Sequence, residues 1–144
     1  MVVGNDVIIH KDIFIKRKAS AIIGNRVAID KGFYCTSRLE IGDYVHISPY
    51  VTSIGGKGQS KFLMEGFNNI MVGARIICGS DRFDDSGLPG ALIPDEYTGR
   101  EIIKDVIVEK FANIGTNSIV LPGSRLRKGV LLTAGSLLIG DTVE

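Results

Sequence analysis

A six-residue period is clearest in residues 102–142, which read IIKDVIVEKFANIGTNSIVLPGSRLRKGVLLTAGSLLIGDT. Every sixth residue from the start of this stretch is aliphatic: Ile102, Val108, Ile114, Val120, Leu126, Leu132 and Leu138. The fourth residue after each of these is small or β-branched: Val106, Ala112, Ser118, Ser124, Val130, Ser136 and Thr142. Two columns that coincide over so many repeats indicate one structural unit copied along the chain.

The same two columns run through most of the remaining sequence, for example at Ile23, Ile29, Ile41, Ile47, Ile70 and Ile76. A period of six fits neither an amphipathic helix nor an alternating strand. It predicts short strands separated by corners, with three hexads in each triangular coil and the aliphatic residue pointing inward. Identical positions would then stack about 4.8 Å apart. We therefore predict an all-β parallel β-helix that forms a single domain over residues 1–144, with five full coils, most of a sixth and part of a seventh.

Three interruptions break the repeat. The first is a small slip at Ala21 and Ile22, and the second is the polar segment GGKGQSK from Gly55 to Lys61. The third, from about Arg82 to Glu101, reads RFDDSGLPGALIPDEYTGRE. Long loops without structure of their own are usually functional or disordered, so a functional lid is one reading of this segment and a solvated decoration is the other.

Composition excludes some classes of protein. The chain has 17 Lys plus Arg against 16 Asp plus Glu, which gives no electrostatic reason to expect a nucleic-acid partner. No apolar run approaches the roughly 20 residues that a membrane helix requires. Charged residues interrupt the first apolar residues, so no signal-peptide pattern is present and a cytoplasmic protein is expected. The two cysteines, Cys35 and Cys78, have no metal or disulfide spacing and are predicted to be buried thiols.

Four stretches carry a resemblance to a known family: IGDYVHISPYVTSIGG, GARIICGSDRFDD, LIPDEYTG and IGTNSIVLPGSRLRKGVLLTAGSL. Together with the hexads they resemble the hexapeptide-repeat acyltransferases, and within them the sugar O-acetyltransferases of lipopolysaccharide, O-antigen and capsule biosynthesis. This resemblance implies a left-handed helix, a homotrimer and transfer from acetyl-CoA. The implied acceptor is a sugar or nucleotide-linked sugar, taken at a hydroxyl or an amine. Neither a metal nor a nucleic acid is implied.

The resemblance also implies a catalytic histidine. His46 lies in the same VHIS context as an outward histidine of the family, and we expect it at a corner, as the base. The alternative is a histidine that forms hydrogen bonds across the trimer interface. Asn69 would stack one coil along and fix the tautomer of the imidazole. The other histidine, His10, is expected to be an exposed residue of the first coil.

Near the long loop the sequence departs from the better-known family pattern, because Asp81 stands where a histidine is usual. An aspartate is a weak base at neutral pH. Either His46 is the base and Asp81 or Asp84 holds the sugar, or the acceptor is an amine that needs little base assistance. Asp81 is thus the second catalytic candidate, and the substrate-binding candidates are Asn69, Arg82, Asp84 and Tyr97. The acidic residues could also form only a solvated loop edge.

The GTNS and TAGS corners resemble the family's pantetheine groove, in which small residues allow the thin arm of CoA to lie against backbone. The expected contacts are Gly115, Thr116, Thr133, Ala134 and Ser136, with Arg127 and Lys128 meeting the phosphates. An ordinary exposed face is the other reading of the two basic residues. Family members usually continue beyond the position of Glu144 into a final coil and a tail that completes the CoA site. Either this sequence is a fragment of a longer chain, or the CoA site is completed differently here.

Two competing functions have different sequence requirements. A metal-dependent hydratase of the carbonic anhydrase type needs three histidines around each zinc, and two histidines in distant coils do not meet that need. A non-catalytic scaffold would need only the repeat. The long loop distinguishes the enzyme from the scaffold, because a uniform rod has no use for it.

Overall fold

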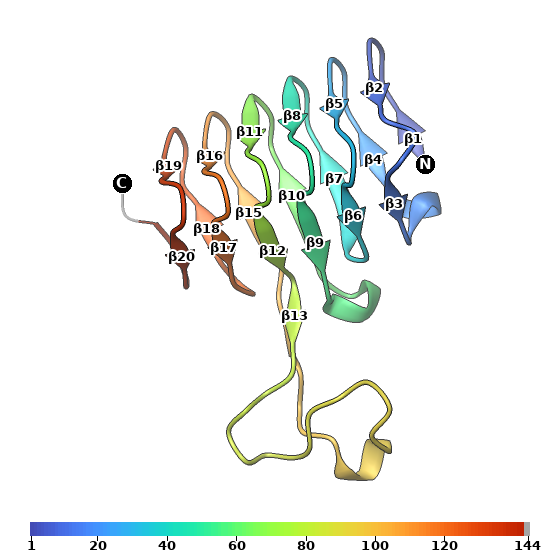
Figure 1. Ribbon diagram of the computed structural model, residues 1–144, viewed down its shortest axis with the longest axis vertical. Coiled ribbons are helices and arrows are strands. Elements are labelled where there is room, and N and C mark those ends of the chain that lie inside the picture. Colours follow the sequence, from blue (N-terminus) through green and yellow to red (C-terminus); the bar gives the residue numbers. More distant parts are fainter. Residues whose placement is uncertain (143–144) are drawn as a thin grey trace.

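The computed structural model describes residues 1–142, and in it three parallel sheets wrap into a prism (Figure 1). Sheet A contains β1 (Val2–Val3), β4 (Ile22–Ile23), β7 (Arg38–Ile41), β10 (Lys61–Met64), β15 (Val106–Val108) and β18 (Arg125–Leu126). Sheet B contains β2 (Ile8–Ile9), β5 (Ala28–Ile29), β8 (Val45–Ile47), β11 (Asn68–Ile70), β16 (Asn113–Ile114) and β19 (Leu131–Leu132). Sheet C contains β3 (Phe14–Ile15), β6 (Tyr34–Cys35), β9 (Thr52–Ile54), β12 (Arg75–Ile77), β17 (Ile119–Val120) and β20 (Leu137–Leu138).

Each coil contributes one strand to each sheet, which confirms the predicted all-β parallel solenoid. Equivalent hexad positions are register partners, as Ile47 and Ile70 are in sheet B. The three sheets have six strands each, so six coils are complete, and a bridge between Arg125 and Asp141 begins a seventh. The sixth coil is therefore more complete than the sequence predicted. Glu144, the position beyond which family members have a tail, lies outside the described residues.

Both sequence columns point into the prism and form one continuous core. The inward side chains of Ile47, Ile70 and Ile114 have no exposed surface, and neither do those of Val106 and Ala112. Burial of one such aliphatic side chain contributes about 1.5–3 kcal/mol. No coil can bury these residues alone, so stability depends on stacking.

The two cysteines are free and buried, as predicted. Burial, and to a smaller extent the nearby Cys78, raises the pKa of the Cys35 thiol to about 12. Burial also raises the pKa of Cys78. Because the thiolate is the nucleophilic form, both cysteines are unreactive residues of the core.

One buried polar side chain joins two coils. Asn68 accepts a hydrogen bond from the backbone N–H of Gly66 at 2.9 Å and donates to the carbonyls of Glu109 and Ala112, both at 2.8 Å. The other members of its column are apolar, serine or threonine. The amide is tolerated in the core because each of these bonds replaces one to water.

The edge between sheets A and B carries a ladder of stacked aromatic rings. The ring centroids of Tyr44 and Phe67 are 4.9 Å apart, and those of Phe67 and Phe111 are 4.8 Å apart. All three residues have φ between 55° and 64°, in the left-handed region that bulky residues rarely adopt. Stacking of aromatic rings contributes about 0.5–1.5 kcal/mol per pair and so offsets part of this backbone strain.

All three interruptions of the repeat lie on one edge of the prism, between sheets C and A. The second contains the short turn η2 (Gly56–Gly58) and the third contains η3 (Asp95–Tyr97). The first irregularity is the turn η1 (Lys18–Ser20), which directly precedes the slip predicted at Ala21 and Ile22, so that slip begins a few residues earlier than predicted. The long loop (residues 82–101) leaves the prism between β13 (Gly79–Ser80) and β14 (Ile102–Ile103), which pair antiparallel, and it extends away from the coils in Figure 1.

Two interruptions touch each other at the base of the long loop. A Cβ atom on Gly55 would lie 2.4 Å from the carbonyl oxygen of Gly79, and the φ of Gly55 is +90°. Glycine is therefore required here for close backbone approach and for its conformation. The contact fixes the second interruption, Gly55 to Lys61, beside the point where the long loop departs.

Candidate functional site

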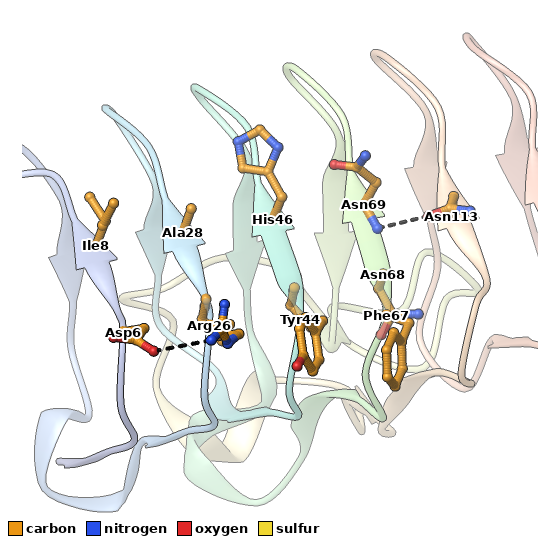
Figure 2. A pocket seen from close by; sticks show the side chains of 12 residues that line it. Asp6, Ile8, Arg26, Ala28, Tyr44, His46, Phe67, Asn68, Asn69 and Asn113 are labelled. Carbon is orange, nitrogen blue, oxygen red and sulfur yellow. Dashed lines mark hydrogen bonds and ion pairs between the residues drawn. The ribbon is translucent and has the colours of Figure 1, made fainter.

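A shallow groove runs over the outer face of sheet B beside the aromatic ladder. Figure 2 shows the outward side chains that line it, which include Arg26, Tyr44, His46, Phe67, Asn69 and Asn113. We call it the histidine groove. It combines aromatic rings, amides and one imidazole on a face that neighbouring coils keep rigid.

His46 points outward, as predicted, but its expected place at a corner is wrong. It is the middle residue of β8, between the fully inward Val45 and Ile47. Successive side chains of a strand point to opposite faces, so the residue between two core residues has to face solvent. The histidine therefore lies on a flat sheet face.

Asp30 is the hydrogen-bond partner of His46. Its Oδ2 lies 2.8 Å from Nε2 of the imidazole. Asn69 is the register partner of His46 in the next coil, as predicted, but within residues 1–142 its amide forms no hydrogen bond to the ring. A carboxylate bound to one ring nitrogen orients an imidazole and fixes its tautomer. The hexad repeat could have indicated Asp30. It is the equivalent of Ser48 in the preceding coil, and this places it close to His46.

A second candidate site, the loop pocket, lies between the long loop and the second interruption. Its charged lining residues are Lys57, Asp81, Asp95 and Glu101. The Oδ2 of Asp81 accepts a hydrogen bond from the backbone N–H of Gly90 at 3.1 Å. Asp81 is thereby held at the base of the long loop, with its second carboxylate oxygen available to a ligand.

Lys57 connects the second interruption to the long loop. Its Nζ lies 2.6 Å from Oε1 of Glu101, and hydrogen bonding to this carboxylate raises the pKa of Lys57. Lys57, Asp95 and Glu101 were not predicted as site residues, because they belong to separate interruptions that only the folded chain brings together.

The other predicted residues of the long loop do not line this pocket. Arg82 pairs with Asp84 at 3.3 Å on the loop surface, and the side chain of Tyr97 is largely exposed. A hydrogen bond from Ser86 is the main cause of the lowered pKa of Asp84. Their predicted substrate contacts would therefore require a partner that approaches the outside of the loop.

His46 and Asp81 lie on different sides of the prism. His46 is on the face of sheet B, whereas Asp81 follows β13 at the opposite edge, between sheets C and A (Figure 1). One chain cannot bring both groups to the same substrate. Any joint action requires two chains.

The predicted CoA contacts also divide into two sets. Gly115 and Thr116 stack on the next coil at the edge between sheets B and C, where the N–H of Gly115 donates to Leu132 at 2.7 Å and that of Gly135 donates to Thr116 at 2.8 Å. The neighbouring predicted residues on this edge are Thr133, Ala134 and Ser136. Thr133 and Ala134 are exposed on this edge, whereas Gly115 is buried because its backbone packs against that of Leu132 and Ala134 in the next coil. The predicted pantetheine contact of Gly115 is therefore covered by the neighbouring coil.

Arg127 and Lys128 lie instead at the edge between sheets A and B, where they contact carboxylates. Arg127 is 3.4 Å from Glu109 and 2.9 Å from Asp141, and the N–H of Lys128 donates to Glu109 at 2.8 Å. A hydrogen bond from Arg125 is the main cause of the lowered pKa of Glu109. The basic cluster is thus largely neutralised and separate from the pantetheine track.

Within residues 1–142, His, Cys, Asp and Glu side chains form no cluster of three that could hold a metal ion. In the same residues, no helix has the length and apolar character to cross a membrane.

Comparison with solved structures defines the class of protein. No family model matches the chain. A complex of AntD, an N-acyltransferase from Bacillus cereus, superimposes with a TM-score of 0.90 at 31% identity, covering 97% of this chain and 73% of AntD. A hexapeptide-repeat acetyltransferase from Vibrio cholerae, VCA0836, shares the fold with a TM-score of 0.57 at 15% identity, covering 97% of this chain and 63% of that one. The chain belongs to the hexapeptide-repeat acyltransferase family.

Within that family, one curated relative is the dTDP-4-amino-4,6-dideoxy-D-glucose acyltransferase of Escherichia coli, which is 32% identical over 124 residues. The match covers 83% of this chain, and the chain spans 62% of the length of that relative. The AntD complex compared above contains dTDP-4-amino-4,6-dideoxyglucose and coenzyme A. A further AntD structure contains dTDP and 3-hydroxybutyryl-CoA.

Proposed function

We propose that this protein transfers an acyl group from an acyl-CoA to the amine of a dTDP-linked amino sugar. The observation that carries the proposal is the loop pocket beside the departing long loop, where the carboxylates of Asp81 and Asp95 lie near the Lys57–Glu101 ion pair. Carboxylates attract and orient an ammonium group. The similarity to AntD and to the Escherichia coli relative supports the same acceptor class.

An amine acceptor accounts for an aspartate where a histidine is usual. The bound ammonium first loses a proton to solvent. The resulting neutral amine attacks the thioester carbonyl, the new C–N bond forms, and the C–S bond breaks to release the CoA thiolate. The proton lost by the amine ends on solvent or on the leaving thiolate. Asp81 would orient the amine, and positioning of this kind supplies much of the barrier reduction in two-substrate reactions.

The acyl-CoA is proposed to lie along the edge between sheets B and C, with its pantetheine arm against Thr116, Thr133 and Ala134. The acceptor site is at a different edge, so the two substrates would meet where neighbouring chains of a homotrimer pack. Apolar side chains on the long loop support this arrangement, because Phe83 is 82% exposed and Leu92 is 96% exposed in the single chain. We expect acetyl-CoA to be the donor. We also expect the product to be used in surface-polysaccharide biosynthesis and the protein to be located in the cytoplasm.

Purified protein is expected to release CoA thiol when it is given dTDP-4-amino-4,6-dideoxyglucose together with acetyl-CoA or 3-hydroxybutyryl-CoA. Thiol release is measured colorimetrically, and the acylated sugar nucleotide is identified by mass spectrometry. dTDP-glucose, which offers only hydroxyl groups, is the matched control and should give no product. Transfer to dTDP-glucose alone would establish an O-acyltransferase. Absence of transfer to either acceptor would favour a scaffold.

His46 is proposed to contribute only from a neighbouring chain. If it accepts the proton of the amine there, His46→Asn should lower kcat by about 100-fold, the lower range for general base catalysis. Trimers that mix His46→Asn and Asp81→Asn chains should then regain part of the activity, because some sites combine two intact residues. A His46→Asn enzyme with full kcat would exclude this role and leave the amine without base assistance.

A further inference from the structure

A cluster of basic side chains lies on the same edge of the prism as the long loop, closer to the first coils. The consecutive residues Lys16, Arg17 and Lys18 surround an open hollow together with Arg38 and the backbone of Gly58. A smaller hollow beside it is lined by Lys16, Arg17 and Lys57. We call the two hollows the cationic pocket. Neither has an acidic lining residue.

Of the basic residues in the cationic pocket, Lys57 is neutralised by Glu101 at 2.6 Å, and the others have little acidic compensation. Among the salt bridges within residues 1–142, none involves Lys16, Arg17 or Lys18. Arg38 reaches a carboxylate only at 4.0 Å. On the opposite side of the prism, by contrast, Arg127 has carboxylate partners.

Arg17 carries the strongest sign of a missing ligand. Its Nε is buried and has no hydrogen-bond partner within the described part of the chain. The guanidinium lies against the backbone of Gly58, where a Cβ atom would be 2.6 Å from Cζ of the arginine. A buried donor without an acceptor is costly. Gly58 thus holds the guanidinium in a fixed place at the wall of the cationic pocket, with Nε covered by protein. An anion in the pocket would be bound by the other N–H groups of the guanidinium.

The cationic pocket adjoins the loop pocket, because Lys57 lines both. Along this edge a region of lysines and arginines is followed by the carboxylates of Asp81, Asp95 and Glu101. A nucleoside diphosphate amino sugar has the complementary order, with two phosphates followed by a sugar that carries an ammonium group. Arginine is suited to the phosphates because its planar fork can bind two oxygens at once.

We propose that the cationic pocket binds the diphosphate of the nucleotide-sugar substrate, with Arg17 as its central contact and the amino sugar in the adjoining loop pocket. This inference rests on the proposed function for the identity of the substrate. It assigns a binding role to Lys16, Arg17 and Lys18, and it sets the direction in which the nucleotide lies along the edge.

Isothermal titration of the whole protein with dTDP and, separately, with CoA tests this proposal. Arg17→Met should raise the Kd for dTDP by about 10-fold to 100-fold, the effect expected for loss of a hydrogen bond between charged groups. The Kd for CoA should stay unchanged. Arg75→Met is the matched control, because Arg75 is an exposed arginine on the outer face of sheet C, where its Nη1 donates to the carbonyl of Tyr50 at 3.3 Å. It should leave dTDP binding unaltered.

The double variant Lys16→Met with Lys18→Met changes two exposed side chains and guards against a folding defect in Arg17→Met. It should weaken dTDP binding and reduce its dependence on salt. Unchanged dTDP affinity in both variants would overturn the proposal, and so would a loss confined to CoA, which would assign the pocket to the phosphates of the donor. Because binding is measured without turnover, a protein that binds dTDP through Arg17 but transfers no acyl group would refute only the proposed function.

Discussion

Replacing Asp81 by asparagine is expected to lower kcat/KM for dTDP-4-amino-4,6-dideoxyglucose by about 100-fold, at the lower end of effects seen for groups that act on a reacting nucleophile. Asparagine keeps the size of the side chain and an oxygen that can accept from Gly90, as Asp81 does at 3.1 Å. The substitution removes only the negative charge. A loss of activity would therefore report on the charge that orients the amine.

Asp85→Asn is the matched control, because Asp85 lies four residues further along the same loop, is exposed and does not line the loop pocket. Its φ of 62° is a conformation that asparagine also adopts readily. This variant should keep kcat/KM within about twofold, since substitutions outside a binding site usually have small effects. Equal losses in the two variants would mean that the loop's overall charge matters and that Asp81 has no specific role.

Replacing Asn68 by alanine is expected to lower the free energy of unfolding by about 3 kcal/mol, because three hydrogen bonds of roughly 1 kcal/mol each are lost. The bonded backbone groups belong to Gly66, Glu109 and Ala112, so the loss affects two coils at once. A domain of this kind has a total stability of about 5–15 kcal/mol. Urea unfolding followed by circular dichroism measures the change.

Asn69→Ala provides the comparison for this effect. Asn69 is the next residue of β11 and faces the histidine groove (Figure 2). Its alanine variant should unfold within about 0.5 kcal/mol of the parent, as exposed substitutions usually do. If both variants were equally stable, the buried amide would have no structural role.

Much of the fold could be predicted from the sequence, because the hexad is a local pattern with a local cause. An inward aliphatic residue such as Ile114 recurs every six positions. Once one of these residues is assigned to the core, the six-residue period assigns the others to the core as well. The prediction of His46 as an outward residue followed from this rule. Its assignment to a corner was wrong because the repeat alone does not say where each short strand ends.

The candidate sites were less predictable. Asp81 was found because it interrupts a familiar pattern at the base of the long loop. Lys57, Asp95 and Glu101 could not be found, since no period relates residues of separate interruptions. Arg17 gave no signal either, because a run of basic residues is most often an exposed face, and only its buried Nε distinguishes it.

The sequence by itself determined that this protein is a stack of hexapeptide coils, because each inward residue needs only its own coil and the next one to be buried. Only the tertiary structure decided which polar residues act together. Each interruption inserts residues between two strands of the repeat, and all three insertions lie on the edge between sheets C and A. That coincidence places Arg17, Lys57 and Asp81 along one line, while His46 faces a different side with Asp30 as its partner.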